Sequence, residues 1–176
     1  MTEDMREHDT WIAKVCDHLN KLIQLDYDAG QTYKLALEHV DDALVWSDLQ
    51  SFLRDHEGHV MELTGIVRDL GGTPVEVHRD FKGVLLEGMT RLRSRTGTLG
   101  ALRAMRTNER LTNRIYDRAA EAYMPPIGQA IVMENLADER RHLAAINAHI
   151  DRLTGKHLYD VAPIDREESQ RHYPHA

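Results

Sequence analysis

The chain has 176 residues, which is enough for one domain whose hydrophobic core folds without disulfides. It carries 29 acidic and 22 basic residues, a formal net charge of −7, so the composition argues against nucleic acid as a partner. No stretch approaches the roughly 18 apolar residues of a membrane span, and the first residues, MTEDMREHD, are acidic and polar, unlike a secretory signal. The single cysteine, Cys16, fits a reducing compartment, so we expect a cytoplasmic protein with no membrane partner.

Two long helices are predicted in the first half of the chain. Apolar residues recur at steps of three and four, which marks the buried face of a helix over about 11–40. The same rhythm predicts a second helix over about 42–70, which Asp41 and Asp42 can cap and which Gly71 ends. Its inward face contains two histidines among apolar residues: Leu49, Phe52, His56, His59, Leu63, Ile66 and Leu70.

Two further helices are predicted after a connection of about 25 residues, which is too long for a tight turn. An amphipathic piece at about 79–93 indicates a short helix within this crossover. A third helix is expected over about 98–123, with an inward face of Leu102, Met105, Glu109, Thr112, Tyr116, Ala119 and Tyr123. Pro126 suits the first turn of a fourth helix over about 126–153, whose inward face runs Val132, Asn135, Glu139, His142, Ile146, His149 or Ile150, and Leu153.

The two halves of the chain repeat one another. A shift of 83 residues aligns tyrosine, acidic, histidine and glycine positions that apolar periodicity alone does not explain. The aligned pairs include Asp26 with Glu109, Tyr33 with Tyr116, Asp55 with Asp138, His56 with Glu139, His59 with His142, and Gly72 with Gly155. We therefore predict an all-α, antiparallel four-helix bundle over residues 1–155, built from two related hairpins joined by the crossover. The polar, aperiodic residues 156–176 are expected to form a loosely ordered tail.

Each inward face replaces apolar residues with ionisable ones near its middle. The six residues, drawn from all four helices, are Asp26, His56, His59, Glu109, Glu139 and His142. At ~1.5 Å per residue they lie ~20–25 Å from their own hairpin turns, so they can meet in one layer. Three buried carboxylates would repel one another or take up protons, and no Lys or Arg lies in the central turns to offset them. Because carboxylates and imidazoles are ligands for iron, manganese and zinc, the layer predicts a metal site.

These positions carry a family resemblance. The first and third helices each have an acidic residue followed seven positions later by tyrosine, and the fourth has Glu139-x-x-His142. Over about residues 11–155 this pattern resembles the ferritin-like superfamily, in particular its bacterioferritin and rubrerythrin members. The stretch from Leu19 to Gly72, with the crossover that follows, more closely resembles a bacterial ferritin-like family with no assigned function. The resemblance implies a ferritin-like bundle with a dinuclear metal site.

The resemblance also implies roles for individual residues. The positions that match the family's ligands are Asp26, His59, Glu109, Glu139 and His142, with Tyr33 and Tyr116 as tyrosines that hydrogen-bond the carboxylates. Two positions depart from the pattern, because Asp26 is one methylene shorter than glutamate and His56 stands where a second bridging glutamate belongs. His56 is either a sixth ligand or a residue that supports the ligands. Because three carboxylates offset less positive charge than four, we expect ferric products to be disfavoured.

Two functions fit these observations. The first is a metal-binding redox protein whose dinuclear iron or manganese centre reacts with dioxygen or peroxide, in an oxidase or stress-related role. The second is a non-catalytic bundle that holds a structural metal such as zinc, or none, and acts in stress response or assembly. A mononuclear site also fits the departures from the family pattern. The fold alone does not choose between these functions, and nothing in the sequence indicates an oligomer.

Overall fold

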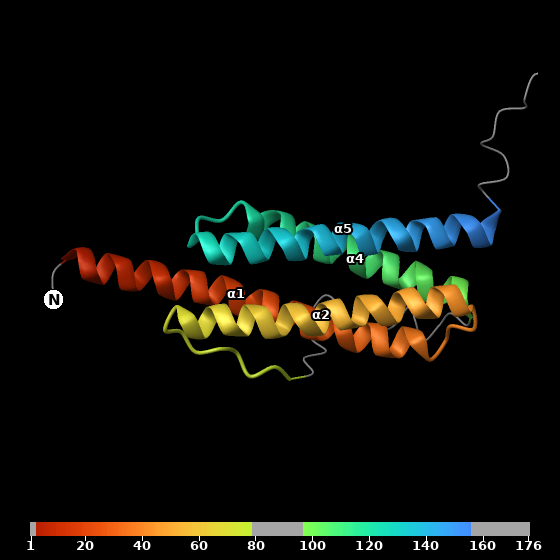
Figure 1. Ribbon diagram of the computed structural model, residues 1–176, viewed down its shortest axis with the longest axis horizontal. Helices are drawn as coiled ribbons and strands as arrows, with labels where there is room; N and C mark the ends of the chain where they lie inside the picture. The colour runs from red at the N-terminus through yellow and green to blue at the C-terminus, as the bar shows by residue number, and fades with distance from the viewer. Residues whose placement is uncertain (1–2, 79–96, 156–176) are drawn as a thin grey trace, which may run out of the picture.

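The structure, a computed structural model, describes residues 3–78 and 97–155, and the regular elements in these ranges are all helices (Figure 1). Helix α1 spans Glu3–Leu37, α2 spans Ala43–Asp69, α4 spans Thr98–Ala120 and α5 spans Pro126–Thr154. The predicted crossover helix at 79–93 and the predicted tail at 156–176 lie outside the described residues. Within the described ranges, no helix combines the length and the apolar character needed to cross a membrane.

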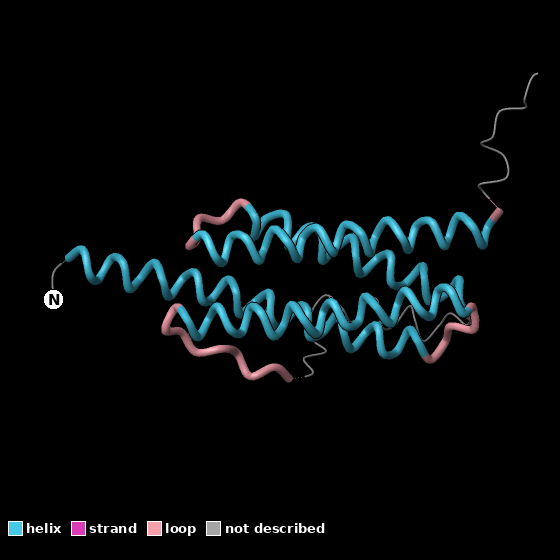
Figure 2. Tube along the Cα trace, viewed as in Figure 1, coloured by secondary structure: helices cyan, strands magenta, loops and turns pink. Residues whose placement is uncertain are grey.

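The helices form two antiparallel hairpins, α1 with α2 and α4 with α5 (Figure 1). The hairpins pack together through α1 against α4 and through α2 against α5. The loops that close the two hairpins lie at opposite ends of the bundle (Figure 2). The start of α4 lies beside the loop of the first hairpin, where the Thr98 hydroxyl accepts a hydrogen bond from the backbone N–H of Asp41 at 3.1 Å. The predicted all-α bundle of two hairpins is confirmed.

Local sequence signals set several helix ends. The side chain of Asp42 accepts hydrogen bonds from the backbone N–H groups of Leu44 and Val45, at 3.1 and 3.0 Å, and is the N-cap of α2. Gly71 follows the end of α2 with a φ of 76°, in the left-handed region that glycine adopts without strain. Pro126 is the first residue of α5, as predicted.

Other predicted helix ends were wrong. Helix α1 begins at Glu3 rather than near residue 11, because the polar residues before Trp11 contain no helix breaker and need no buried face to be helical. Helix α4 ends at Ala120, whose carbonyl accepts a hydrogen bond from the Gln129 side chain at 2.6 Å, three residues before the predicted end. Tyr123, predicted on the inward face, therefore lies beyond the helix and is 85% exposed.

Two apolar clusters fill the interior and leave a polar layer between them. The first cluster contains Val15, Cys16, Leu19, Leu22, Ile23, Leu63, Ile66, Val67, Tyr116, Met124, Val132 and Leu136. The second contains Tyr33, Ala36, Val45, Leu49, Phe52, Ala101, Leu102, Ala104, Met105, Ile146 and Ile150. Along each helix the two clusters occupy opposite ends of the buried face, so the ionisable residues lie in the middle. Apolar packing on both sides holds this layer rigidly and shields it from bulk water.

Candidate metal centre

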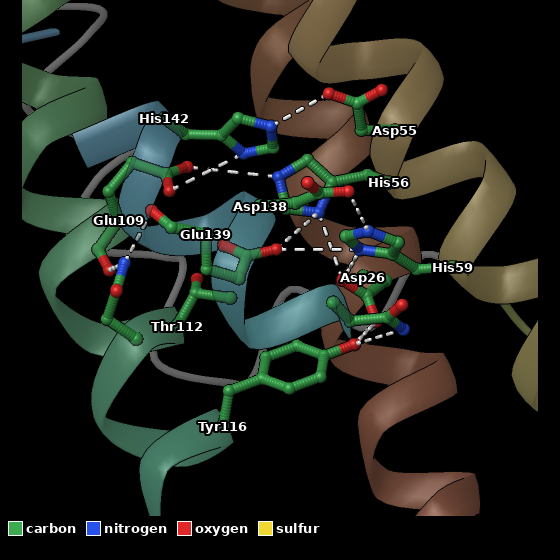
Figure 3. Close-up of polar contacts among 12 residues, drawn as sticks. Asp26, Asp55, His56, His59, Glu109, Thr112, Tyr116, Asp138, Glu139 and His142 are labelled. Atoms are coloured by element: carbon green, nitrogen blue, oxygen red, sulfur yellow. Dashed lines mark hydrogen bonds and ion pairs between the residues drawn. The ribbon is translucent and has the colours of Figure 1, made fainter. Parts of the chain in front are cut away.

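All six ionisable residues selected from the sequence lie in this polar layer (Figure 3). They are Asp26 on α1, His56 and His59 on α2, Glu109 on α4, and Glu139 and His142 on α5. Each exposes 3% or less of its surface. The structure therefore brings together every one of these residues, and their role as metal ligands stays a prediction.

The six residues form two adjoining groups of four side chains. The Asp26 group consists of Asp26, His56, His59 and Glu139, and the Glu109 group consists of His56, Glu109, Glu139 and His142. In each group, one potential ligand atom per residue lies within 4.8 Å of all the others. Two donors on opposite sides of an ion with bonds of ~2.1 Å would lie ~4.2 Å apart, so small side-chain shifts suffice for convergence. His56 and Glu139 belong to both groups.

Two buried tyrosines hold the outer carboxylates from the opposite hairpin. The Tyr33 hydroxyl on α1 donates to Oε1 of Glu109 on α4 at 2.7 Å. In the repeat-related contact, the Tyr116 hydroxyl on α4 donates to Oδ2 of Asp26 on α1 at 2.5 Å. Burial raises the pKa of both tyrosines well above its ordinary value, and the adjacent carboxylates raise it further. Both hydroxyls therefore stay protonated and act as donors.

Two aspartates likewise contact histidines of the opposite hairpin, Asp55 with His142 and Asp138 with His59 (Figure 3). Oδ2 of Asp55 on α2 lies 3.0 Å from Nε2 of His142 on α5. Oδ2 of Asp138 on α5 lies 3.4 Å from Nε2 of His59 on α2. Arg141 forms ion pairs with both aspartates and so joins α2 to α5. A carboxylate on one ring nitrogen fixes the orientation of an imidazole and aims its other nitrogen at a metal.

Some residues that support this layer were not predicted from the sequence. Asp55 and Asp138 are two of them, although the repeat aligns them with each other and each directly precedes a selected residue. A third is Asn113, whose amide donates to the backbone carbonyls of Glu109 and Glu139 at 2.8 and 2.9 Å and so ties α4 to α5. No pattern in the sequence signals this contact, because it depends on how the two helices pack.

His56 lies between the two groups (Figure 3). Its Nδ1 is 3.0 Å from Oδ1 of Asp26 and 3.4 Å from Oε1 of Glu139. Its Nε2 faces Oε1 of Glu109 at 3.8 Å. The ring therefore presents one nitrogen to each group, at the position that a carboxylate, Glu139, occupies in the other half of the repeat.

The buried charges of the layer compensate one another only in part. Burial alone would lower the pKa of His56, but the carboxylates around it, Glu139 first, raise it well above its ordinary value. Burial raises the pKa of Glu139 well above its ordinary value, although His56 opposes this. Burial alone would raise the pKa of Asp26 and of Glu109, but their neighbours together lower the pKa of each carboxyl: His56 and His59 for Asp26, and His56, His142 and Tyr33 for Glu109. Burial lowers the pKa of His142 to about 4, so this imidazole is neutral. Three carboxyl groups thus surround His56, whose raised pKa favours its cationic form, and the neutral His142 adds no charge to offset them.

Five buried polar atoms of the layer have no hydrogen-bond partner among the described residues. They are Nε2 of His56, Oε2 of Glu109, both carboxylate oxygens of Glu139, and Nδ1 of His142. Leaving a buried polar atom unpartnered costs about 1–3 kcal/mol, so five of them in one place indicate a partner from outside the polypeptide. Carboxylate oxygens and imidazole nitrogens are donors for divalent transition metals, so the residues present fit a metal ion.

The fold and its polar layer define the class of protein: the chain is a ferritin-like four-helix bundle. It is similar to a two-domain protein from Anabaena variabilis that contains DJ-1/ThiJ/PfpI-like and ferritin-like domains, with a TM-score of 0.65 and 14% identity over 92% of this chain and 40% of that one. The chain thus spans less than half the length of that protein. It is also similar to a ferritin-like, diiron-carboxylate protein from Bacillus anthracis, with a TM-score of 0.50 and 19% identity over 89% of this chain and 99% of that one.

The sequence further places the chain in a particular family. Residues 14–122, more than half of the chain, match the family described as domain of unknown function DUF2383, so the chain belongs to this family. This agrees with the predicted resemblance to a ferritin-like family with no assigned function. No curated protein matches the sequence significantly.

Proposed function

We propose that this protein binds iron or manganese in the polar layer of its bundle and that the metal centre reacts with dioxygen or peroxide. The observation that carries the proposal is the set of five unpartnered buried donor atoms, because they converge where two groups of potential ligands adjoin. The two groups share Glu139, and a shared carboxylate is the bridge expected in a dinuclear site. The diiron-carboxylate description of the Bacillus anthracis neighbour supports iron.

Within this proposal the polypeptide supplies donors, orientation and a dry environment. Bound iron or manganese would supply the redox change and a position for a small oxidant. His59 and His142 would bind through Nδ1, because Asp138 and Asp55 occupy the Nε2 atoms. Glu139 would offer one oxygen to each group. The tyrosine hydroxyls keep one oxygen of each outer carboxylate fixed. The other oxygen of Glu109 is left for the ion, whereas that of Asp26 also lies against His56 and His59.

A cavity between α1 and α2 supports access by a small molecule. Its volume is about 360 Å³, and its lining includes Tyr27, Gly30 and Val60 as well as Asp26 and His56. The last two residues are themselves fully buried, so the cavity reaches the layer without exposing it to bulk water. We assign this cavity as the route for dioxygen or peroxide. The buried free thiol of Cys16 is consistent with the cytoplasmic location that we propose for the reaction.

The charges of the donor set limit the oxidised state of the metal. Two divalent ions carry four positive charges, and the six residues supply three carboxylates and no fourth. Asp55 and Asp138 restore some negative charge behind the histidines, but Arg141 pairs with both of them. Buried uncompensated charge is costly, so further oxidation to ferric ions is disfavoured and turnover is slow.

A second function is favoured by one feature of the Glu109 group. This group offers four protein donors to one ion, and structural zinc sites are closed in the same way, with all four positions filled by protein. Such a metal would stabilise the bundle without turnover, and the protein would then act in stress response or assembly.

Elemental analysis of the purified protein, followed by exposure of its anaerobic Fe(II) complex to air, separates these functions. The redox proposal expects iron or manganese in the purified protein and the appearance of ferric absorption in air. Zinc, together with an Fe(II) complex that air does not change, would favour the structural function. A protein that purifies without metal and takes up no added metal would contradict both.

A further inference from the structure

The five unpartnered donor atoms are distributed unevenly between the two groups. His56, Glu109, Glu139 and His142 each contribute at least one of them, and these four residues are the complete Glu109 group. The two residues that belong to the Asp26 group alone, Asp26 and His59, contribute none. The repeat would lead us to expect the same pattern on both sides, so the structure breaks the symmetry of the sequence.

Three residues of the Glu109 group, His142, Glu109 and His56, each have one side-chain atom in contact with a neighbouring residue and one unpartnered atom that faces the other ligands. Asp55 lies against Nε2 of His142, which leaves its Nδ1 free. Tyr33 holds Oε1 of Glu109, which leaves its Oε2 free 3.9 Å from that same Nδ1. Asp26 lies 3.0 Å from Nδ1 of His56, which leaves its Nε2 free. Three of the four donors of this site are therefore oriented by a second contact, and both oxygens of the fourth, Glu139, are unpartnered.

The two residues that belong to the Asp26 group alone, Asp26 and His59, are instead satisfied by contacts within the protein. Oδ1 of Asp26 lies 3.0 Å from His56 and 3.4 Å from His59, and its Oδ2 accepts the Tyr116 hydroxyl. Both nitrogens of His59 have carboxylate neighbours at 3.4 Å, from Asp26 and Asp138. An ion in this group would have to displace contacts that already exist, whereas an ion in the Glu109 group would satisfy atoms that have none.

The charges of the two groups also favour binding of the first ion in the Glu109 group and of the second in the Asp26 group. One divalent ion in the Glu109 group is balanced by the two carboxylates Glu109 and Glu139. A second divalent ion would find only Asp26 still uncompensated, which leaves a net positive charge in a buried layer. Uncompensated buried charge is strongly unfavourable, so the second ion binds more weakly than the first.

The geometry points to an unequal pair of metal positions. The primary site binds one divalent transition ion through His56 Nε2, Glu109, Glu139 and His142 Nδ1. The first role of Asp26 is to position His56 for this site. This inference rests on the proposed metal binding and adds the order of occupancy and the role of each half. Two nitrogens and two oxygens in a four-coordinate arrangement suit Zn(II), Co(II) or Fe(II).

Titration of the full chain with Co(II) and with Zn(II) tests this order. Calorimetry gives the number of ions and their affinities, and the visible bands of Co(II) report its coordination. We expect one tightly bound equivalent with the intense bands of four-coordinate cobalt, and a second that binds at least about tenfold more weakly. The matched variants are His142→Gln and His59→Gln, which remove repeat-related imidazoles.

His142→Gln should lose the tight equivalent and the intense bands, and His59→Gln should keep both. Asp26→Asn should keep the stoichiometry and weaken the tight equivalent by about 10- to 100-fold, because it removes the charge that orients His56. Circular dichroism of each variant without metal checks its fold, and Glu109→Gln replaces His142→Gln if that variant does not fold.

Either of two results would overturn the inference and leave metal binding itself in place. One is two metal equivalents of equal affinity. The other is a loss of the tight equivalent in His59→Gln that is as complete as in His142→Gln. Failure of the unmodified protein to bind Co(II), Zn(II) or Fe(II) would overturn the proposed function as well.

Discussion

Position 56 carries an imidazole where the other half of the repeat carries the carboxylate of Glu139. The ring of His56 approaches Asp26, Glu139 and Glu109, so it lies at the centre of the polar layer. A glutamate there could bridge two ions and would add a fourth negative charge, whereas a neutral imidazole adds none. Under the proposed metal binding, this one residue would limit how many ions the layer holds and how readily bound iron is oxidised.

Replacing His56 with Glu should add a second tightly bound metal equivalent and accelerate Fe(II) oxidation, because both the bridging geometry and the missing charge are restored. Without metal the same variant should melt at a lower temperature, since four buried carboxyl groups repel one another or take up protons. Metal titration and stopped-flow absorbance measure the first two effects, and thermal melting in a chelator measures the third.

The matched control is His149→Gln on α5, because His149 pairs with Asp48 at 2.7 Å, away from the polar layer. It should change neither metal stoichiometry nor oxidation rate. If His56→Glu binds no more metal and oxidises iron no faster, His56 is not at the bridging position.

Asp55 and Asp138 provide a second test at single-residue scale, since each holds one histidine and each pairs with Arg141. Asp55→Asn should weaken the first metal equivalent by about 10- to 100-fold, because it loosens His142 in the Glu109 group. Asp138→Asn disturbs Arg141 to a similar degree but acts on His59, so it should leave the first equivalent nearly unchanged. Competition with a chromophoric chelator measures the affinity of the first equivalent in both variants. An equal loss of affinity in the two variants would contradict the inferred difference between the Glu109 and Asp26 groups.

At the scale of single elements, the N-cap of α2 is open to a direct test. Asp42→Ala should lower the melting temperature by a few degrees, because the N–H groups of Leu44 and Val45 lose their acceptor. Asp42→Asn keeps an acceptor and should lose less, although it gives up the ion pair with Arg152.

The same contacts fix the direction of the pH dependence. Hydrogen bonds from the Val45 backbone and from Arg152 lower the pKa of Asp42 below its ordinary value of 3.8. A lowered pKa means that the stabilisation is fully present above about pH 4 and is lost as the pH falls through the lowered value. The difference in melting temperature between the unmodified protein and Asp42→Ala should therefore shrink on acidification below about pH 4. A difference that stays constant would show that the charge of the cap does not contribute.

The sequence predicts the helices and the polar layer because both depend on spacing within one helix. A step of three or four residues fixes which side chains share a face, so Glu139 and His142 are identifiable as inward residues before any packing is known. The partners of these residues depend on how the helices rotate and approach each other. For this reason the Asp55–His142 contact and the two carbonyl contacts of Asn113 do not follow from periodicity.

Helix ends were predictable only where a strong local signal exists. Asp42 and Pro126 set their helix starts through hydrogen bonding and a fixed φ, which are properties of single residues. The start of α1 at Glu3 has no such signal, because polar residues with adequate helix propensity extend the helix beyond its buried face. Tyr123 was misplaced for a related reason, since an apolar residue at the right spacing is inward only while the helix continues.

At the scale of the whole molecule, the described part of the chain divides its stability and its chemistry between layers. Two apolar clusters at either end of the bundle stabilise the four helices, and the middle layer carries side chains that destabilise the fold unless they are compensated. Because all six ionisable residues lie on long helices rather than loops, their positions are held rigidly. Compensation by a bound cation would therefore stabilise the entire bundle.

Thermal melting of the full chain, first in a chelator and then with Fe(II), Mn(II) or Zn(II), tests this account most directly. An ion that binds only the folded state at 100 times its Kd adds about 2.7 kcal/mol to the free energy of unfolding, which raises Tm by about 5–10 °C for a chain of this size. We predict such an increase with at least one of the three metals, and its loss in Glu139→Ala and in His142→Ala. Identical melting curves in the chelator and in all three metals would contradict the assignment of the polar layer as a metal centre.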